Sequence, residues 1–190
     1  MKENAHHFIG ISIPSSIQTE LQRIQKHLQL TKYYKKVTNL QDFHITLLFL
    51  GGWEKKFKEK MWNNLQNELN SISPFSLSLL NIGYFGKEVN PRVIWVGVEE
   101  SNPLHELQKK ITSTAEIMNF PIEKRPYKPH ITLAKSIINT CSVSLNDSNV
   151  QTITWGVDAF HLFEVNPGQS PMYKTVSKIQ LTGYNRIRVE

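Results

Sequence analysis

The tetrapeptide His-Ile-Thr-Leu occurs twice in this chain, at residues 44–47 and 130–133. Each copy lies in a short apolar run that is typical of a β-strand. Alternate side chains of a strand point to one face, so each strand pairs its histidine with its threonine on a polar face, opposite an apolar one. Chance repetition of this pattern has a probability on the order of a percent or below. The repeat therefore indicates a functional signal.

The other apolar patterns predict a mixed α and β chain in which strands outnumber helices. We expect helices over 17–28, 57–72 and 102–118, and strands over 8–13, 43–50, 75–84, 93–98, 130–135, 152–165 and 172–181. The basic segment 33–36 is expected to be a connection, and 86–91 a turn-rich link between two strands. Each motif follows a strand and a helix, which predicts an internal duplication of a strand–helix–strand unit. A pseudo-twofold would then place the two polar faces on opposite walls of one shared cleft.

Size and charge limit the classes of protein that this chain can belong to. A chain of 190 residues fits one domain or two small lobes that share an interface. The net charge of +6 favours a polyanionic partner, although the sequence does not say whether these charges share a face. Cys141 is the only cysteine, which excludes an internal disulfide and fits a reducing compartment such as the cytoplasm. No apolar run approaches the roughly 18 residues of a membrane span, so no membrane is expected as a partner.

Two histidines and two threonines together suit phosphoryl chemistry. Imidazole accepts and donates protons near neutral pH, so His44 and His130 can serve as acid and base on opposite sides of one substrate without a metal or other cofactor. The hydroxyls of Thr46 and Thr132 can donate to the non-bridging oxygens of a phosphate. A phosphodiester, and a cyclic phosphate in particular, is the substrate that this set of groups favours.

Both motifs and their flanks resemble a known family. The stretches 43–51 (Phe-His-Ile-Thr-Leu-Leu-Phe-Leu-Gly) and 127–135 (Tyr-Lys-Pro-His-Ile-Thr-Leu-Ala-Lys) are similar to the His-x-Thr-x signatures of the two-histidine phosphoesterase superfamily. The closest similarity is to its RNA 2′,3′-cyclic phosphodiesterase branch, historically called 2′-5′ RNA ligase. The resemblance covers roughly residues 7 to 182 in element order, with its residue-level specificity in the two motifs.

The resemblance implies a fold and an activity. The fold is α+β and bilobal, with two antiparallel β-sheets and outer helices around a central cleft, and residues 1–190 form a single domain of two intertwined lobes. The activity is metal-independent hydrolysis of RNA 2′,3′-cyclic phosphate ends to 2′-phosphates. By analogy His130 activates water and His44 protonates the 3′ oxygen, with Thr46 and Thr132 on the phosphate; the reverse assignment of the histidines stays open. We expect a monomer.

Further residues near the second motif are candidates for substrate binding: Arg125, Tyr127, Lys128 and Lys135. Counting from His44, Phe43 and Phe49 fall on the dry face of their strand, so we expect core packing for both rather than stacking on a base. The other histidines have no metal-ligand neighbours, and neither motif strand brings a carboxylate or cysteine two residues from its histidine. The sequence therefore disfavours a zinc site.

Two other functions are compatible with the same motifs. The first is a module that binds a nucleotide or an RNA end without turnover. The second is an enzyme that acts on 2′-5′ linkages, on a small cyclic phosphate, or in the direction of ligation. Product formation distinguishes the first from an enzyme, and a comparison of substrates distinguishes the second.

Overall fold

A computed structural model describes residues 5–52, 54–69, 72–123, 125–138 and 150–183, so Cys141 lies outside the described residues. The α-helices are α1 (Ser15–His27), α2 (Lys55–Leu69) and α3 (Asn102–Ile117). The strands are β1 (His7–Ser12), β2 (Tyr34–Val37), β3 (His44–Gly51), β4 (Phe75–Lys87), β5 (Asn90–Val98), β6 (His130–Ile137), β7 (Thr154–Val157), β8 (Ala159–Val165) and β9 (Tyr173–Gln180). The predicted α+β class is confirmed.

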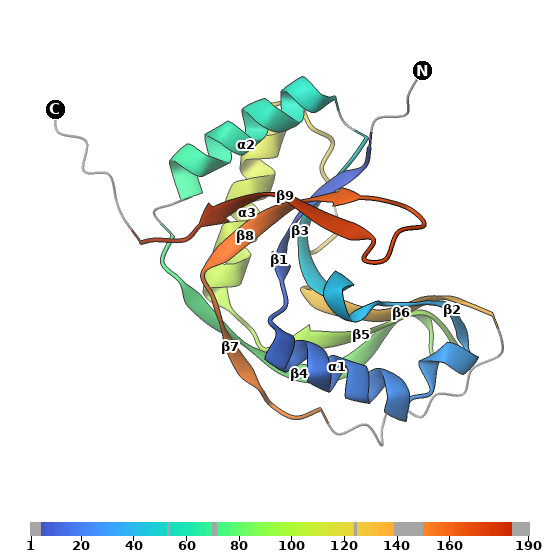
Figure 1. The fold of residues 1–190 in the computed structure, drawn as a ribbon. Helices are drawn as coiled ribbons and strands as arrows, with labels where there is room; N and C mark the ends of the chain where they lie inside the picture. Colours follow the sequence, from blue (N-terminus) through green and yellow to red (C-terminus); the bar gives the residue numbers. More distant parts are fainter. Residues whose placement is uncertain (1–4, 53, 70–71, 124, 139–149, 184–190) are drawn as a thin grey trace, which may run out of the picture.

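The described strands follow one path of neighbours, β7-β4-β5-β6-β3-β1-β8-β9, with β2 paired to β6, and every pairing is antiparallel. The two sheets that the sequence predicts are therefore joined, and the junction is the β3–β6 pair at the middle of the path (Figure 1). The two motifs lie on neighbouring strands at this junction. A single matched pair, Ile45 with Ile131, connects them.

The three helices follow the predicted apolar spacing. Ile17, Leu21 and Ile24 are among the buried residues of α1, and Leu104, Leu107 and Ile111 are among those of α3. Each of these two helices packs against the motif strand of the other half of the chain: α1 contacts β6, and α3 contacts β3. In Figure 1, α2 and α3 lie side by side toward the top and α1 lies toward the bottom. None of the described helices is long and apolar enough to cross a membrane.

Two local predictions differ from the structure. The segment 33–36 is not a plain connection, because Tyr34–Val37 forms β2 on the edge of β6. The link between β4 and β5 is also shorter than expected, since Lys87 pairs with Asn90 and only two residues separate the strands. The sequence did not predict either feature, because neither segment alternates apolar and polar residues.

Candidate functional site

The four motif side chains share one patch of the sheet. Ile45 of β3 pairs with Ile131 of β6 in an antiparallel bridge, and the four polar motif residues lie on either side of these two isoleucines in their strands. Both isoleucines are fully buried, whereas the four polar residues are half-buried on the opposite face. We call the group formed by His44, Thr46, His130 and Thr132 the histidine face.

The two motifs also share a β-bulge. In each motif strand the leucine of His-Ile-Thr-Leu has no partner in the register, so the neighbouring strand skips it. The matched pairs are Gly10 with Thr46 and Ile9 with Leu48 in one half, and Trp95 with Thr132 and Ile94 with Ala134 in the other. Both halves of the predicted duplication therefore contain the same β-bulge.

The bulges change which residues lie on the histidine face. Phe49 is 55% exposed, so its predicted core packing is wrong, whereas Phe43 is buried as predicted. Simple alternation fails because the extra residue at Leu47 inverts the face of the residues that follow it. Lys135 is the equivalent of Phe49 in the second motif and is also exposed. Both therefore share the face of the histidines.

Each histidine ring is fixed by the same kind of hydrogen bond. His44 Nδ1 lies 2.7 Å from the carbonyl oxygen of Asp42, and His130 Nδ1 lies 2.7 Å from that of Lys128. A carbonyl only accepts, so Nδ1 carries the proton in both rings and the neutral imidazole has its lone pair on Nε2. Both histidines are thus held in the tautomer that accepts a proton at Nε2.

The environment of both histidines favours the neutral ring. Burial lowers the pKa of His44 to about 4, and the positive charges of Lys135 and His130 act in the same direction. Burial also lowers the pKa of His130, with a further contribution from Lys128. The carbonyl bonds oppose these effects without overcoming them. A nearby anion is what would raise both pKa values again.

Aromatic rings surround both imidazoles. The ring centroid of His44 lies 4.6 Å from that of Phe8 and 4.9 Å from that of Tyr173. The ring of His130 lies 4.9 Å from that of Phe85 and 6.0 Å from that of Trp95. Lys128 Nζ lies 4.6 Å from the Trp95 centroid, a cation–π distance that keeps its ammonium beside His130. The structure therefore places Lys128 close to the second histidine, where the sequence position puts it.

A buried carboxylate attaches the last loop of the chain to the first motif. Asp42 is buried, and its carboxylate accepts from the backbone N–H groups of Met172 at 3.1 Å and Tyr173 at 3.0 Å. This pair of bonds places the ring of Tyr173 edge-on to His44. Asp42 thus supports His44 twice, through its backbone carbonyl and through the loop that its side chain holds.

Tyr127 and Arg125, two of the residues predicted to bind substrate, both contact other groups of the protein. The Tyr127 hydroxyl donates to the carbonyl oxygen of Thr46 at 3.1 Å, so it connects the second motif to the first. Burial raises the pKa of this hydroxyl and keeps it protonated as a donor. The guanidinium of Arg125 is exposed and forms its ion pair with Glu123. The structure therefore supports a positioning role for Tyr127 and gives Arg125 no contact with the histidine face.

A glycine on the neighbouring strand makes room for the indole beside His130. Gly83 is the register partner of Trp95, and a β-carbon at Gly83 would overlap the indole ring. Any larger residue at this position would displace Trp95 from its place against His130. The absence of a side chain at Gly83 is thus part of the site.

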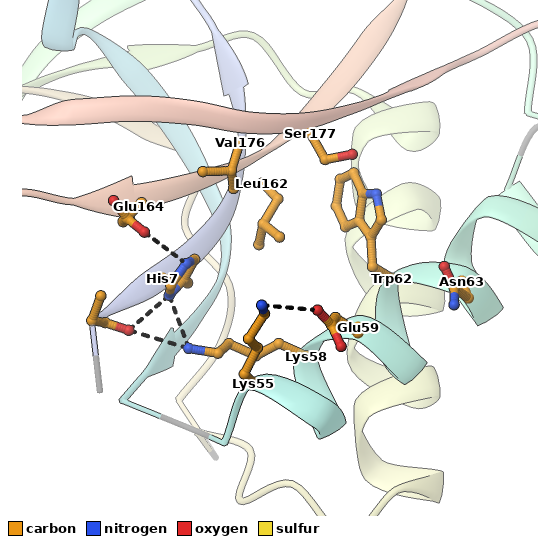
Figure 2. Close-up of a pocket in the computed structure, with 11 residues that line it drawn as sticks. His7, Lys55, Lys58, Glu59, Trp62, Asn63, Leu162, Glu164, Val176 and Ser177 are labelled. Carbon is orange, nitrogen blue, oxygen red and sulfur yellow. Dashed lines mark hydrogen bonds and ion pairs between the residues drawn. The ribbon is translucent and has the colours of Figure 1, made fainter. Parts of the chain in front are cut away.

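A cavity of about 710 Å³ lies away from the histidine face, between α2 and the strands β1, β8 and β9 (Figure 2). His7 lines it, whereas Phe8, the next residue of β1, contacts His44, so the cavity is on the other side of the strand. Its charged groups contact one another: Lys58 Nζ lies 2.9 Å from His7 Nδ1, and His7 Nε2 lies 3.6 Å from Glu164. The charged groups of this cavity are therefore paired with one another. Because the histidine face carries both motifs, we take it as the candidate active site.

Sequence reasoning identified the two motifs but missed their surroundings. Asp42, Tyr173, Phe8, Phe85 and Trp95 contact the histidines, and only Asp42 is close to a motif in sequence. The position of Asp42, two residues before His44, was the one feature of the sequence that could have indicated a contact with the site. The aromatic residues come from other strands, and no sequence pattern links them to the motifs.

Comparisons with known proteins show the family and the fold to which this chain is similar. Residues 13–169 match the family model described as the 2′-5′ RNA ligase superfamily. A Bacillus subtilis (strain 168) protein named RNA 2′,3′-cyclic phosphodiesterase is 31% identical over 181 residues, which cover 93% of this chain and 97% of that protein. A crystal structure of a Thermus thermophilus protein matches with a TM-score of 0.81 at 25% identity, covering 95% of this chain and 100% of that chain. E. coli LigT, in a crystal structure with 3′-AMP, has a TM-score of 0.77 at 19% identity over 94% of this chain and 98% of LigT, and shows a similarity of fold.

Proposed function

Because this chain belongs to the 2′-5′ RNA ligase superfamily, we propose that it hydrolyses RNA 2′,3′-cyclic phosphate ends to 2′-phosphates. The observation that carries this proposal is the matched pair of imidazoles, each fixed through Nδ1 and each next to a threonine on one sheet face. The relatives that share the family include the B. subtilis protein named for this activity.

The histidine face suits an in-line displacement on phosphorus. One imidazole takes a proton at Nε2 from a water molecule, whose oxygen then forms a bond to phosphorus. The bond between phosphorus and the ribose 3′ oxygen breaks, and the other imidazole gives that oxygen a proton. The hydroxyls of Thr46 and Thr132 donate to the non-bridging oxygens as negative charge builds up on them. The product carries a 2′-phosphate and a free 3′-hydroxyl.

The roles of the two histidines follow the family resemblance: His130 is the base and His44 is the acid. The lowered pKa of both rings gives a ready base, but the acid must hold a proton before it can act. The phosphate of the substrate supplies the negative charge that raises the pKa of His44 on binding. We therefore expect His44 to take up a proton when the substrate binds, which makes it able to act as the acid.

Two imidazoles can perform both proton transfers, so the proposed reaction needs no metal ion. Among the described residues, no three His, Cys, Asp or Glu side chains gather as potential metal ligands. The groups that contact the histidines are aromatic rings and backbone carbonyls instead. Both proton transfers of the proposed reaction are therefore assigned to the two imidazoles.

The proposal is tested by replacing each histidine separately. We expect His44→Ala and His130→Ala each to lower kcat on an RNA 2′,3′-cyclic phosphate end by about two to four orders of magnitude, the contribution of a positioned acid or base. Circular dichroism and the melting temperature report whether each variant folds. Loss of the alkaline limb of the pH–rate profile identifies the acid, and loss of the acidic limb identifies the base. A folded variant with wild-type turnover would exclude the two-histidine mechanism.

A further inference from the structure

We infer that Lys36 and Lys135 bind an internucleotide phosphate of the RNA, on the 5′ side of the cyclic end. This subsite rests on the proposed function and deepens it, because it makes an oligonucleotide rather than a cyclic mononucleotide the preferred substrate. Lys36 belongs to β2, the strand that the sequence patterns did not predict.

The strand registers place both lysines on the histidine face. Trp95 pairs with Thr132 and Val93 pairs with Lys135, and Trp95 and Val93 lie two residues apart on β5. Thr132 and Lys135 therefore share a face in spite of the bulge at Leu133. On the other edge of β6, Lys36 pairs directly with Lys135, and directly opposed residues of an antiparallel pair share a face as well.

The two lysines are directly opposed on neighbouring strands, and no described carboxylate forms an ion pair with either. Among the described residues, neither Lys36 nor Lys135 has a hydrogen bond or ion pair, whereas Lys55 and Lys56 on α2 pair with Glu59 and Glu54. Partial burial of the Lys135 side chain against the sheet lowers its pKa, and the charge of Lys36 acts in the same direction. Like charges directly opposed on neighbouring strands are unfavourable. An anion between them would remove this repulsion.

The lysine pair lies on one side only of the proposed phosphate site, toward β2. The charge of Lys135 reaches His44 and contributes to its lowered pKa. Thr132 and Lys135 are two register steps apart, roughly 7 Å along the strand, which is of the order of one nucleotide of an extended single strand. In the other half of the duplication Phe49 occupies the position of Lys135, so that side has no equivalent charge. The asymmetry sets the direction of the RNA backbone across β6 and β2.

The chemistry of the pair selects a phosphodiester strand. A cyclic mononucleotide has a single phosphate, which the threonines and histidines hold under the proposed function. An oligonucleotide adds one phosphate per residue, and each contact between such a phosphate and a lysine releases counterions. The pair therefore adds affinity and salt dependence for RNA without adding base specificity.

The test compares two substrates and two matched variants. The substrates are 2′,3′-cyclic AMP and a hexanucleotide that ends in a 2′,3′-cyclic phosphate. The variants are Lys36→Gln and, as control, Lys35→Gln, since Lys35 is an exposed neighbour with the same charge on the opposite face of β2. We expect Lys36→Gln to lower kcat/KM about five- to tenfold on the hexanucleotide, mainly through KM, and less than about twofold on cyclic AMP. The slope of log kcat/KM against log salt for the hexanucleotide should become less steep by about 0.7, the contribution of one phosphate contact.

Three results would overturn the inference: an equal loss on both substrates, no loss on the hexanucleotide, or an equal effect of Lys35→Gln. If the wild-type protein hydrolyses neither substrate, the proposed function fails and the subsite is judged by binding alone. Fluorescence anisotropy of a labelled hexanucleotide with a 2′-phosphate end then provides the measurement. Lys36→Gln must still weaken this binding about five- to tenfold and Lys35→Gln must not; otherwise the subsite is excluded.

Discussion

At the scale of single residues, the site depends on the protonation of His44. Its ring lies between Phe8 and Tyr173, and its Nδ1 hydrogen is bound to the carbonyl of Asp42. Burial of the ring lowers its pKa to about 4, and the bond to the Asp42 carbonyl opposes this effect without overcoming it. The unliganded protein thus keeps His44 neutral at the pH where an unfolded chain begins to protonate its histidines.

This pKa links the stability of the fold to pH. Imidazole in the unfolded chain titrates near pH 6.5, so between pH 6.5 and 4 the unfolded state binds the proton of His44 more tightly than the folded state. The free energy of unfolding is unaffected by this group above about pH 7 and falls as the pH falls through this window. We expect His44→Gln to reduce the loss of stability between pH 7.5 and pH 5 by about 1–2 kcal/mol, measured by urea unfolding at both values.

The matched control for this measurement is His27→Gln, because His27 is exposed at the end of α1. The control should lose as much stability between pH 7.5 and pH 5 as the wild-type protein does. The same acid sensitivity in His44→Gln as in the wild-type protein would contradict the assigned environment of His44.

The sequence predicted the principal residues of the candidate site and placed one of their neighbours wrongly. The structure brings the two His-Thr pairs together, as the repeat indicated. Phe49 was assigned to the core because the alternation of strand faces was counted across a bulge that no sequence pattern predicts. The extra residue of a β-bulge has no characteristic type unless it is a glycine, and in both motifs it is a leucine.

At the scale of elements, the contact between β4 and β5 positions the second histidine. The missing side chain of Gly83 leaves space for the indole of Trp95, which lies against His130 and under the ammonium of Lys128. The strand pair therefore acts on the site through two aromatic residues, Trp95 of β5 and Phe85 of β4, whose rings both lie against His130. No sequence pattern in β4 indicates that Gly83 serves this purpose, because a glycine within a strand has several other uses.

Substitution of Gly83 tests this contact. We expect Gly83→Ala to cost about 1–3 kcal/mol of stability, the typical cost of overpacking, and to lower kcat because Trp95 must move away from His130. Chemical denaturation and turnover of the cyclic substrate provide the two readouts. Gly156→Ala is the control, since a β-carbon at Gly156 on β7 has open space around it. Equal behaviour of the two variants would exclude the proposed packing constraint.

Element boundaries were predictable where the apolar period was long. The three helices were found within about two or three residues at each end because their buried faces repeat over several turns. Strand β2 was missed because it is short and carries two lysines at its centre. Its place is decided by pairing with the edge of β6, which is a contact of tertiary structure.

At the scale of the whole molecule, the two halves of the duplication are interlocked. Helix α1 of the first half packs on β6, where the side chain of Gln25 donates to the carbonyl of Leu133 at 2.9 Å. Helix α3 of the second half packs on β3. We infer from these exchanged contacts that residues 1–190 act as a single domain, in which neither half completes its core without the other. The histidine face lies where the halves meet, because β3 and β6 are the strands that join them.

The measurement that tests the central claim most directly is the identity of the product formed without metal. The wild-type protein, in excess chelator, is incubated with a hexanucleotide that ends in a 2′,3′-cyclic phosphate, and the end group is identified by mass and by phosphatase sensitivity. We expect complete conversion to a 2′-phosphate, with a mass gain of one water, and about a hundredfold or greater loss of rate in His130→Ala. A reaction that stops in chelator, or a 3′-phosphate as the product, would contradict the account of two imidazoles acting on the 3′ leaving oxygen.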